Sequence, residues 1–379
     1  MTDRKNKIPF NKPFIIGKEL DYIAQTISNL HLSGDGPYTK QCHKWLEKRL
    51  GCDKAFLTHS GTGALEMAAI LCNLAPGDEV IMPSFTFVST ANAFVLRGAV
   101  PVFVDIRPDT LNINEKKISQ AISSRTKVIV PMHYGGVSCA MDEIMKIAAH
   151  YDLFVVEDAA QAMLSKYKRK FLGTLGHLGC LSFHETKNII SGEGGALLIN
   201  DKRLVERAEI IWEKGTNRKK FFKKEVDKYS WVDIGSSFLP SELVGAFLYA
   251  QLEQADKVVA NRSQIFQKYY QSLSVIEQKG FIKRPYRESN NHIFYIIVRS
   301  TEIRNKLIKY LCDSGISSTF HYIPLHSSPA GRKFGKTSGD LRYTNEISEK
   351  LIRLPMYYGM HDKDIKKVVS KIKEFYGTI

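Results

Sequence analysis

The chain has 379 residues, of which 44% are hydrophobic and 25% are charged, so it can bury a large core without cross-links. That balance excludes a disulfide-stapled miniprotein, a disordered tail and a fibrous repeat. The net charge of +15 favours an anionic partner, but the basic residues form no continuous patch. Because the sequence shows neither a helix-turn-helix nor an aromatic–basic RNA signature, we expect no nucleic-acid partner.

The six cysteines form no Cys-x-x-Cys pair, and no histidine cluster joins them. This pattern indicates reduced thiols in a cytoplasmic protein, so we expect neither a disulfide framework nor a bound metal. The N-terminal segment lacks the apolar stretch of a signal peptide. No apolar run approaches the roughly 20 residues of a membrane span, so we expect no membrane partner.

The first two-thirds of the chain alternates short apolar runs with segments of helical periodicity. The predicted strands cover 54–58, 79–82, 100–105, 127–132, 153–157, 178–183 and 196–199. The predicted helices cover 63–73, 86–96, 115–123, 140–150 and 202–213. Short apolar strands between helices favour an α/β fold whose large, mostly parallel sheet is covered on both faces.

The last third has an α+β pattern. A long helical stretch over 241–274 is expected to bridge to a second domain. Beyond it we predict strands at 292–298 and near 318–321, and helices at 303–314, 345–353 and 363–376. We therefore expect a large domain of residues 1–250 and a smaller C-terminal domain of residues 251–379.

Two segments place polar groups at strand ends. Ser60-Gly61-Thr62 lies between a strand and a helix, where backbone N–H groups bind phosphate, although most such turns are only helix caps. Glu157 and Asp158 end an apolar strand, at the edge where ligands bind in open α/β sheets. A carboxylate there either pairs with a cationic ring nitrogen or caps the next segment.

Two further segments offer an amine and an aromatic ring. Lys187 follows a buried strand, and a lysine that is desolvated there becomes a nucleophile for carbonyls, although a solvent-facing turn lysine is more common. The rings of 83–88 lie beyond another strand end; such rings are usually core and occasionally stack on a flat cofactor. A phosphate cup, a ring, a carboxylate and a lysine together predict a pyridoxal 5'-phosphate site.

With these segments the chain resembles the DegT/StrS-type sugar aminotransferases, which are fold-type I pyridoxal-phosphate enzymes. The matching segments are 60–62, 83–88, 157–161, 182–188 with 192–195, and 321–326. Within the family, the chain most resembles the dTDP-4-amino-4,6-dideoxygalactose transaminases of enterobacterial common antigen synthesis. That pathway, like lipopolysaccharide biosynthesis, makes a cell-surface polysaccharide. It extends from 8–11 to Arg353-Leu354-Pro355.

This resemblance implies a homodimer with shared active sites. The reaction it implies moves an amino group from L-glutamate to the C4 keto group of dTDP-4-keto-6-deoxyglucose. The products would be dTDP-4-amino-4,6-dideoxygalactose and 2-oxoglutarate. A sister nucleotide-sugar aminotransferase, acting at C3 or giving an equatorial C4 amine, is the alternative.

The resemblance also implies roles for the matching residues. Lys187 would hold the cofactor covalently and act as general acid and base. Asp158 would keep the ring nitrogen protonated, Gln161 would bond the ring hydroxyl, and Phe87 would lie against the ring. A sugar dehydratase of the family would instead carry histidine at the position of Lys187.

The phosphate group is expected to bind Gly61, Thr62 and Ser182. In the family, an asparagine of the partner subunit, two residues after a glycine, completes this site. Here that position is Ser237, so the resemblance is incomplete, and either Ser237 or Asn217 is expected to donate in its place.

The substrate-binding residues are predicted less directly. His326, His184 and Tyr134 are expected to face the sugar. The densest basic run, which begins with Arg218 and Lys219, suits either a solvated loop or the diphosphate of the substrate, bound across the dimer.

Overall fold

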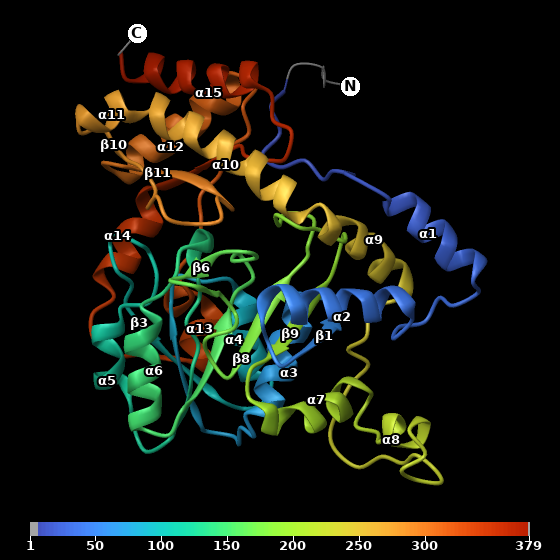
Figure 1. The fold of residues 1–379 in the computed structure, drawn as a ribbon. Helices are drawn as coiled ribbons and strands as arrows, with labels where there is room; N and C mark the ends of the chain where they lie inside the picture. The colour runs from blue at the N-terminus through green and yellow to red at the C-terminus, as the bar shows by residue number, and fades with distance from the viewer. Residues whose placement is uncertain (1–6, 378–379) are drawn as a thin grey trace.

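A large sheet forms the centre of the molecule in the computed structural model, which describes residues 7–377 (Figure 1). Its eight strands lie in the order β1-β9-β8-β5-β4-β2-β3-β12. All run parallel to one another except β9, which is antiparallel to both of its neighbours. The strands are β1 (Lys54–Thr58), β2 (Glu79–Pro83), β3 (Val100–Val104), β4 (Thr126–Ile129), β5 (Phe154–Asp158), β8 (Leu178–Ser182), β9 (Gly195–Ile199) and β12 (Lys336–Thr337).

Helices cover both faces of this sheet because its strands are apolar on both sides. In β1, Phe56 packs into one cluster, whereas Ala55 and Leu57 pack into another on the opposite face. The first face is covered by α3 (Gly61–Leu71), α4 (Val88–Val95) and α7 (Val205–Trp212). The other is covered by α2 (Pro37–Leu50), α5 (Ile118–Ala121), α6 (Met141–His150) and α9 (Glu242–Glu253). The predicted α/β fold is confirmed.

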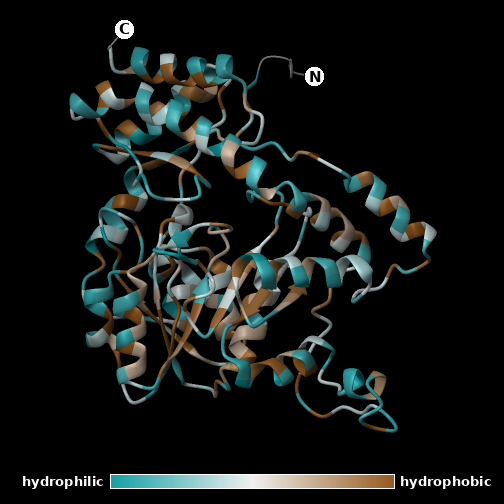
Figure 2. Ribbon diagram, viewed as in Figure 1, coloured by the Kyte–Doolittle hydropathy of each residue, from teal (hydrophilic) through white to brown (hydrophobic). Residues whose placement is uncertain are grey.

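A second hydrophobic core lies above this sheet in Figure 1. A three-stranded antiparallel sheet of β10 (Ile282–Lys283), β11 (Phe294–Val298) and β13 (Leu351–Leu354) packs there against helices. These are α10 (Ala255–Ser272), α11 (Ser274–Gln278), α12 (Thr301–Asp313) and α15 (Asp362–Phe375). The hydropathy colouring shows apolar residues alternating with polar ones along these helices (Figure 2). We retain the division of the chain near residue 250 as a proposal.

The chain crosses between the two cores more than once. Ile8 belongs to the second core, although α1 (Glu19–Ser28) and α2 follow it along the large sheet. Conversely, Leu325 and Leu341 pack into the first core, on either side of α13 (Pro329–Phe334) and β12. The chain then continues through α14 (Arg342–Lys350) into β13. Within residues 7–377, no helix combines the length and the apolar character needed to cross a membrane.

Three predicted elements differ most clearly from the structure. The helix predicted over 345–353 ends at Lys350, because the next four residues pair with β11 as β13. The strand predicted near 318–321 is an extended segment joined only by an isolated bridge between Thr319 and Arg353. The helical stretch over 241–274 is divided at Gln254, whose backbone leaves the helical region. The two N-terminal helices, α1 and α2, were not predicted.

Candidate active site

A cavity of about 420 Å³ opens at the carboxyl edge of the large sheet. Because β1, β2, β5 and β8 run parallel, the segments that follow them meet at this edge. We call it the Lys187 cavity. It brings together the predicted residues Gly61, Thr62, Phe87, Asp158, Gln161, Ser182, His184 and Lys187.

Asp158 supplies the buried carboxylate of the cavity. It is 3% exposed, and its Oδ2 accepts a hydrogen bond of 2.6 Å from the Thr90 hydroxyl. That hydroxyl also bonds Thr86 at 2.7 Å, while Oδ1 accepts the backbone N–H of Ala160 at 3.1 Å. Donors on both oxygens fix the orientation of the carboxylate toward the cavity.

The neighbouring carboxylate, Glu157, has a structural position. Alternation along β5 turns Glu157 away from the cavity. Its oxygens accept the backbone N–H groups of Gly173, Leu175 and Gly176, and it pairs with His133 at 2.8 Å. Of the two carboxylates that end the strand, only Asp158 therefore faces the cavity.

Lys187 lies in the turn after β8, where its backbone N–H bonds the carbonyl of His184. Desolvation lowers the pKa of its amine to about 8; the positive charge of Arg353 acts in the same direction, and Asp158 opposes it. Roughly a tenth of such an amine is unprotonated at pH 7, a far larger share than for an ordinary lysine. The cavity therefore holds a nucleophilic amine near a fixed carboxylate.

The N-terminus of α3 forms the cup predicted for phosphate. Ser60 caps the helix by accepting the N–H of Gly63 at 3.0 Å. Gly61 approaches β8 so closely that a Cβ there would lie 2.8 Å from the Cβ of Ser182. The Thr62 and Ser89 hydroxyls bond each other at 2.8 Å. Unpaired N–H groups and hydroxyls at a helix N-terminus suit an anion.

Gln161 and Phe87 complete the predicted cofactor set. The Gln161 carbonyl accepts the N–H of Gly135 at 2.7 Å, and its amide donates to the Tyr322 hydroxyl at 2.7 Å, which leaves one N–H free. Phe87 is 54% exposed at the cavity, whereas Phe85 is fully buried. An amine, a carboxylate, an anion cup and an open ring face fit pyridoxal phosphate.

Sequence reasoning missed several residues of the cavity wall, and four of them lie far from the predicted segments of the large sheet, namely His292, His321, Tyr322 and Arg353. They come from segments around the second core, so local patterns near the strand ends of the large sheet could not place them. Burial lowers the pKa of both His292 and His321. A signal was present, since His321, Tyr322 and Arg353 all lie in segments that carry the resemblance.

The three predicted sugar-facing residues lie in different places. His184 lines the Lys187 cavity and bonds Thr186 at 2.9 Å. Tyr134 is fully buried behind the wall, where its hydroxyl bonds His321 at 2.9 Å. His326 lies outside the lining, with its ring bonded to Ser84 at 2.7 Å. Only His184 of the three lines this cavity in the described part of the chain.

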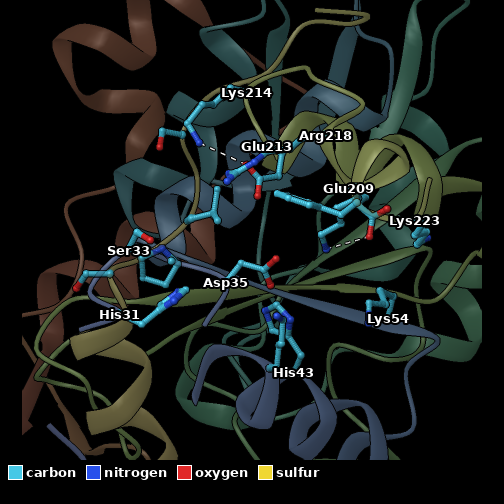
Figure 3. A pocket seen from close by; sticks show the side chains of 18 of the residues that line it. His31, Ser33, Asp35, His43, Lys54, Glu209, Glu213, Lys214, Arg218 and Lys223 are labelled. Atoms are coloured by element: carbon cyan, nitrogen blue, oxygen red, sulfur yellow. Dashed lines mark hydrogen bonds and ion pairs between the residues drawn. The ribbon is translucent and has the colours of Figure 1, made fainter. Parts of the chain in front are cut away.

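Arg218, Lys219 and Ser237 line a separate hollow of about 820 Å³, which we call the basic cavity (Figure 3). Among the described residues, none lines both cavities. Lys219 pairs with Glu209 at 2.9 Å, and Arg218 with Glu213 at 3.7 Å. Asn217 directly precedes α8 (Arg218–Phe222), and its side chain accepts the N–H of Ser230. Within one chain, the residues predicted to act across a dimer thus lie apart from Lys187.

Comparisons with known proteins identify the family of the chain. Residues 13–373 match the DegT/DnrJ/EryC1/StrS aminotransferase family. The spore coat polysaccharide biosynthesis protein SpsC of Bacillus subtilis is 31% identical over 386 residues, covering 99% of this chain and 98% of that protein. A GDP-perosamine synthase of Escherichia coli O157:H7 is 30% identical over 377 residues, covering 98% of this chain and 99% of that protein.

A solved structure extends the likeness to the fold. The crystal structure of the aminotransferase TlmJ from Streptoalloteichus hindustanus has a TM-score of 0.89 at 28% identity, covering 98% of this chain and 99% of that one. The predicted family and cofactor are confirmed. The chain belongs to the DegT/DnrJ/EryC1/StrS aminotransferase family and is a pyridoxal-phosphate-dependent sugar aminotransferase.

Proposed function

We propose that this enzyme transfers the amino group of L-glutamate to C4 of dTDP-4-keto-6-deoxyglucose. The products are dTDP-4-amino-4,6-dideoxygalactose and 2-oxoglutarate. The observation that carries the transamination is the amine of Lys187 in one cavity with the carboxylate of Asp158. A lysine at this position also argues against the dehydratase alternative, which needs histidine there. The acceptor sugar rests on the sequence resemblance.

Each residue near the amine has a proposed task. When bound, pyridoxal phosphate supplies an aldehyde that accepts the amino group and a ring that withdraws electrons. Lys187 anchors the cofactor and, once the donor displaces it, moves the proton of the donor α-carbon. Asp158 holds a proton at the ring nitrogen, Gln161 donates to the ring hydroxyl, and Phe87 covers one ring face.

The phosphate is proposed to sit on the α3 N-terminus, held by Gly61, Thr62 and Ser182. A homodimer would bring Ser237 or Asn217 of a second copy to this phosphate, because neither lines the Lys187 cavity of its own chain. The six cysteines are free thiols, which supports a cytoplasmic location for the reaction.

A second acceptor follows from the relatives. Two of them, from Escherichia coli and Caulobacter vibrioides, are named GDP-perosamine synthases and are each 30% identical to this chain. A GDP-linked keto sugar is therefore the alternative to the dTDP-linked one. Amination at C3 and an equatorial C4 amine are the remaining variants of the same chemistry.

The test is to identify the product by NMR after incubating the holoenzyme with L-glutamate and either the dTDP-linked or the GDP-linked 4-keto sugar. An axial amine at C4 of the dTDP sugar is the expected result. Turnover of the GDP sugar alone, or an equatorial amine, would replace the proposed acceptor with a sister specificity. No amino sugar from either nucleotide would contradict the proposal.

A further inference from the structure

Three histidines of the described chain line the Lys187 cavity, and hydrogen bonds assign a tautomer to two of them. The backbone N–H of Thr186 donates to Nδ1 of His184 at 3.2 Å, so the neutral ring of His184 carries its proton on Nε2. His184 therefore offers a donor at Nε2. His292 is the opposite case, because its surroundings place the proton on Nδ1.

The proton of His292 is assigned by hydrogen bonds that start at a backbone carbonyl. The carbonyl oxygen of Asn290 can only accept, so Asn188 presents its amide Nδ2 to that oxygen, at 3.3 Å. The side-chain oxygen of Asn188 then faces Nδ1 of His292 at 2.9 Å, and this oxygen also only accepts. Nδ1 must therefore donate, which leaves Nε2 of a neutral ring as a hydrogen-bond acceptor.

The surroundings of His292 keep its ring neutral. Charged groups of both signs lie near it: the cations Lys187, Arg262 and Arg353, and, in the cavity lining, the carboxylates Asp158 and Glu193. Among the described residues, no carboxylate is bonded to this ring. Burial and then the charge of Lys187 lower the pKa of His292 well below its ordinary value.

The segment that carries His292 is fixed to the cavity wall. Asn290 donates to the backbone carbonyl of Gln161 at 2.9 Å, and its side-chain oxygen accepts the N–H of His292 at 3.1 Å. The buried Arg262 donates to the backbone carbonyl of His292. The ring is thus held beside Asn188, the residue that follows Lys187 in the sequence.

An acceptor and a donor of the cavity have no partner in the chain. Among the hydrogen bonds of residues 7–377, none uses Nε2 of His292 and none uses the amine of Lys187. The amine is carried on a flexible four-carbon stem and can rotate. To take a proton from the donor, its lone pair must point at the donor α-carbon, and a bond from one N–H to a fixed acceptor restricts that rotation.

We propose that His292 is a positioning residue for Lys187: its Nε2 accepts one N–H of the amine after the donor has displaced the lysine. This inference rests on the proposed role of Lys187 as the proton carrier. The lone pair of the neutral amine takes the proton of the donor α-carbon, and the electron pair of the broken C–H bond is withdrawn toward the cofactor ring. The ammonium group that results keeps its bond to Nε2.

Two substitutions separate this role from a purely structural one. Asparagine places its amide near the position of Nδ1, so His292→Asn keeps a donor for Asn188 and loses the acceptor at Nε2. Glutamine places its amide near the position of Nε2, so His292→Gln keeps an acceptor and loses the bond to Asn188. The proposal predicts that His292→Gln is the more active variant, whereas a structural role predicts the reverse order. His150→Asn, at the exposed end of α6, is the matched control and should leave both half-reactions unchanged.

The rates are measured by stopped-flow absorbance, with the holoenzyme mixed with L-glutamate and the pyridoxamine-phosphate form mixed with the keto sugar. In His292→Asn both half-reactions should slow roughly 10-fold, because the same amine moves the proton in each. The apparent Kd for L-glutamate should change less than about 3-fold, since the acceptor contacts the lysine and not the donor. α-Deuterated L-glutamate should give a larger isotope effect in this variant than in the wild type.

Two further measurements do not depend on turnover. α-Methyl-L-glutamate displaces the lysine but has no α-proton to lose. In a crystal structure of the holoenzyme with this analogue, Nζ of Lys187 should lie about 2.7–3.2 Å from Nε2 of His292. NMR of the apoprotein with isotope-labelled histidine tests the tautomer, and the His292 signal is identified by its absence from His292→Asn. The expected result is a proton on Nδ1 and none on Nε2.

Four results would overturn the inference. They are a proton on Nε2 in the apoprotein, a distance above about 3.5 Å in the analogue complex, a His292→Asn variant more active than His292→Gln, and a loss confined to the apparent Kd for L-glutamate. A wild type that reacts with L-glutamate but never aminates the dTDP sugar would overturn the proposed acceptor sugar alone. A wild type inert toward L-glutamate would overturn the proposed donor, and the tautomer of the apoprotein would still decide the role of Nε2.

Discussion

The polar side chains of the two cavities differ in burial. In the Lys187 cavity, Asp158 and Gln161 are 3% and 4% exposed, and each is bonded to fixed donors or acceptors of the chain. In the basic cavity, the Arg218 side chain is 45% exposed, and Lys219 pairs with a glutamate on the neighbouring helix. The basic cavity is the larger of the two and carries more cations.

The difference shows that the number of charged side chains lining a cavity does not indicate where the reaction occurs. Exposed lysines and arginines remain hydrated, and their ion pairs contribute little. A desolvated amine has an altered pKa, and a buried carboxylate is held in one orientation. Because little water surrounds these groups, their electrostatic interaction with a bound molecule is screened less than at the surface. Variants in the two cavities should therefore differ in the size and the kind of effect.

The largest effect is expected from Lys187→Ala. Without the amine, the cofactor loses its covalent anchor, and the donor α-carbon loses its base. We expect kcat/KM to fall by at least about 10³-fold, while the thermal midpoint of the apoprotein stays close to that of the wild type. Steady-state kinetics and differential scanning fluorimetry measure the two quantities. Normal turnover in this variant would remove Lys187 from the mechanism.

A smaller loss is expected from Asp158→Asn, which keeps the shape but removes the negative charge opposite the ring nitrogen. We expect kcat to fall about 10²- to 10³-fold, with the cofactor still bound. Thr90→Val removes only the hydroxyl that donates to Oδ2 and should cost roughly 10-fold. Coupled-assay kinetics measure both variants. If Asp158→Asn matched the wild type, the charge would not be needed.

The desolvation of Lys187 can be tested through pH. Its pKa lies below the ordinary value for lysine, so the free amine forms as pH rises through about 8. Below that pH, the rate of cofactor loading onto the apoprotein should rise about tenfold per pH unit, and it should level off above it. Loading is followed by the visible absorption band. The same series with Nα-acetyl-lysine, whose ε-amine is free, corrects for titration of the cofactor. A loading rate that levels off only near the ordinary pKa of lysine would contradict a desolvated Lys187 amine.

The smallest effects are expected in the basic cavity. Arg218→Gln with Lys219→Gln removes two cations that are already paired, so we expect KM for the sugar nucleotide to rise only about 3- to 10-fold. The half-reaction with L-glutamate should not change. Steady-state kinetics at two salt concentrations measure the effect, which salt should reduce. A large loss in the glutamate half-reaction would break the proposed separation between the cavities.

The sequence predicted the elements around the Lys187 cavity closely. The run 54–58 is β1 with the predicted bounds, and Asp158, at the end of β5, lines the Lys187 cavity. These predictions succeeded because a buried parallel strand is a short apolar run and its ligand residues follow directly. The helix predicted over 345–353 failed because Leu351–Leu354 pairs with β11, a segment more than fifty residues away in sequence.

The sequence by itself determined the lysine, the carboxylate and the helix cup, because each is local to one strand end of the large sheet. Only the tertiary structure decided that Arg353, His292 and His321 complete the wall and that Arg218 does not. The physical reason is the range of the contacts. Strand alternation and helix caps act over a few residues, whereas a guanidinium reaches this cavity only after two separate cores have packed against each other.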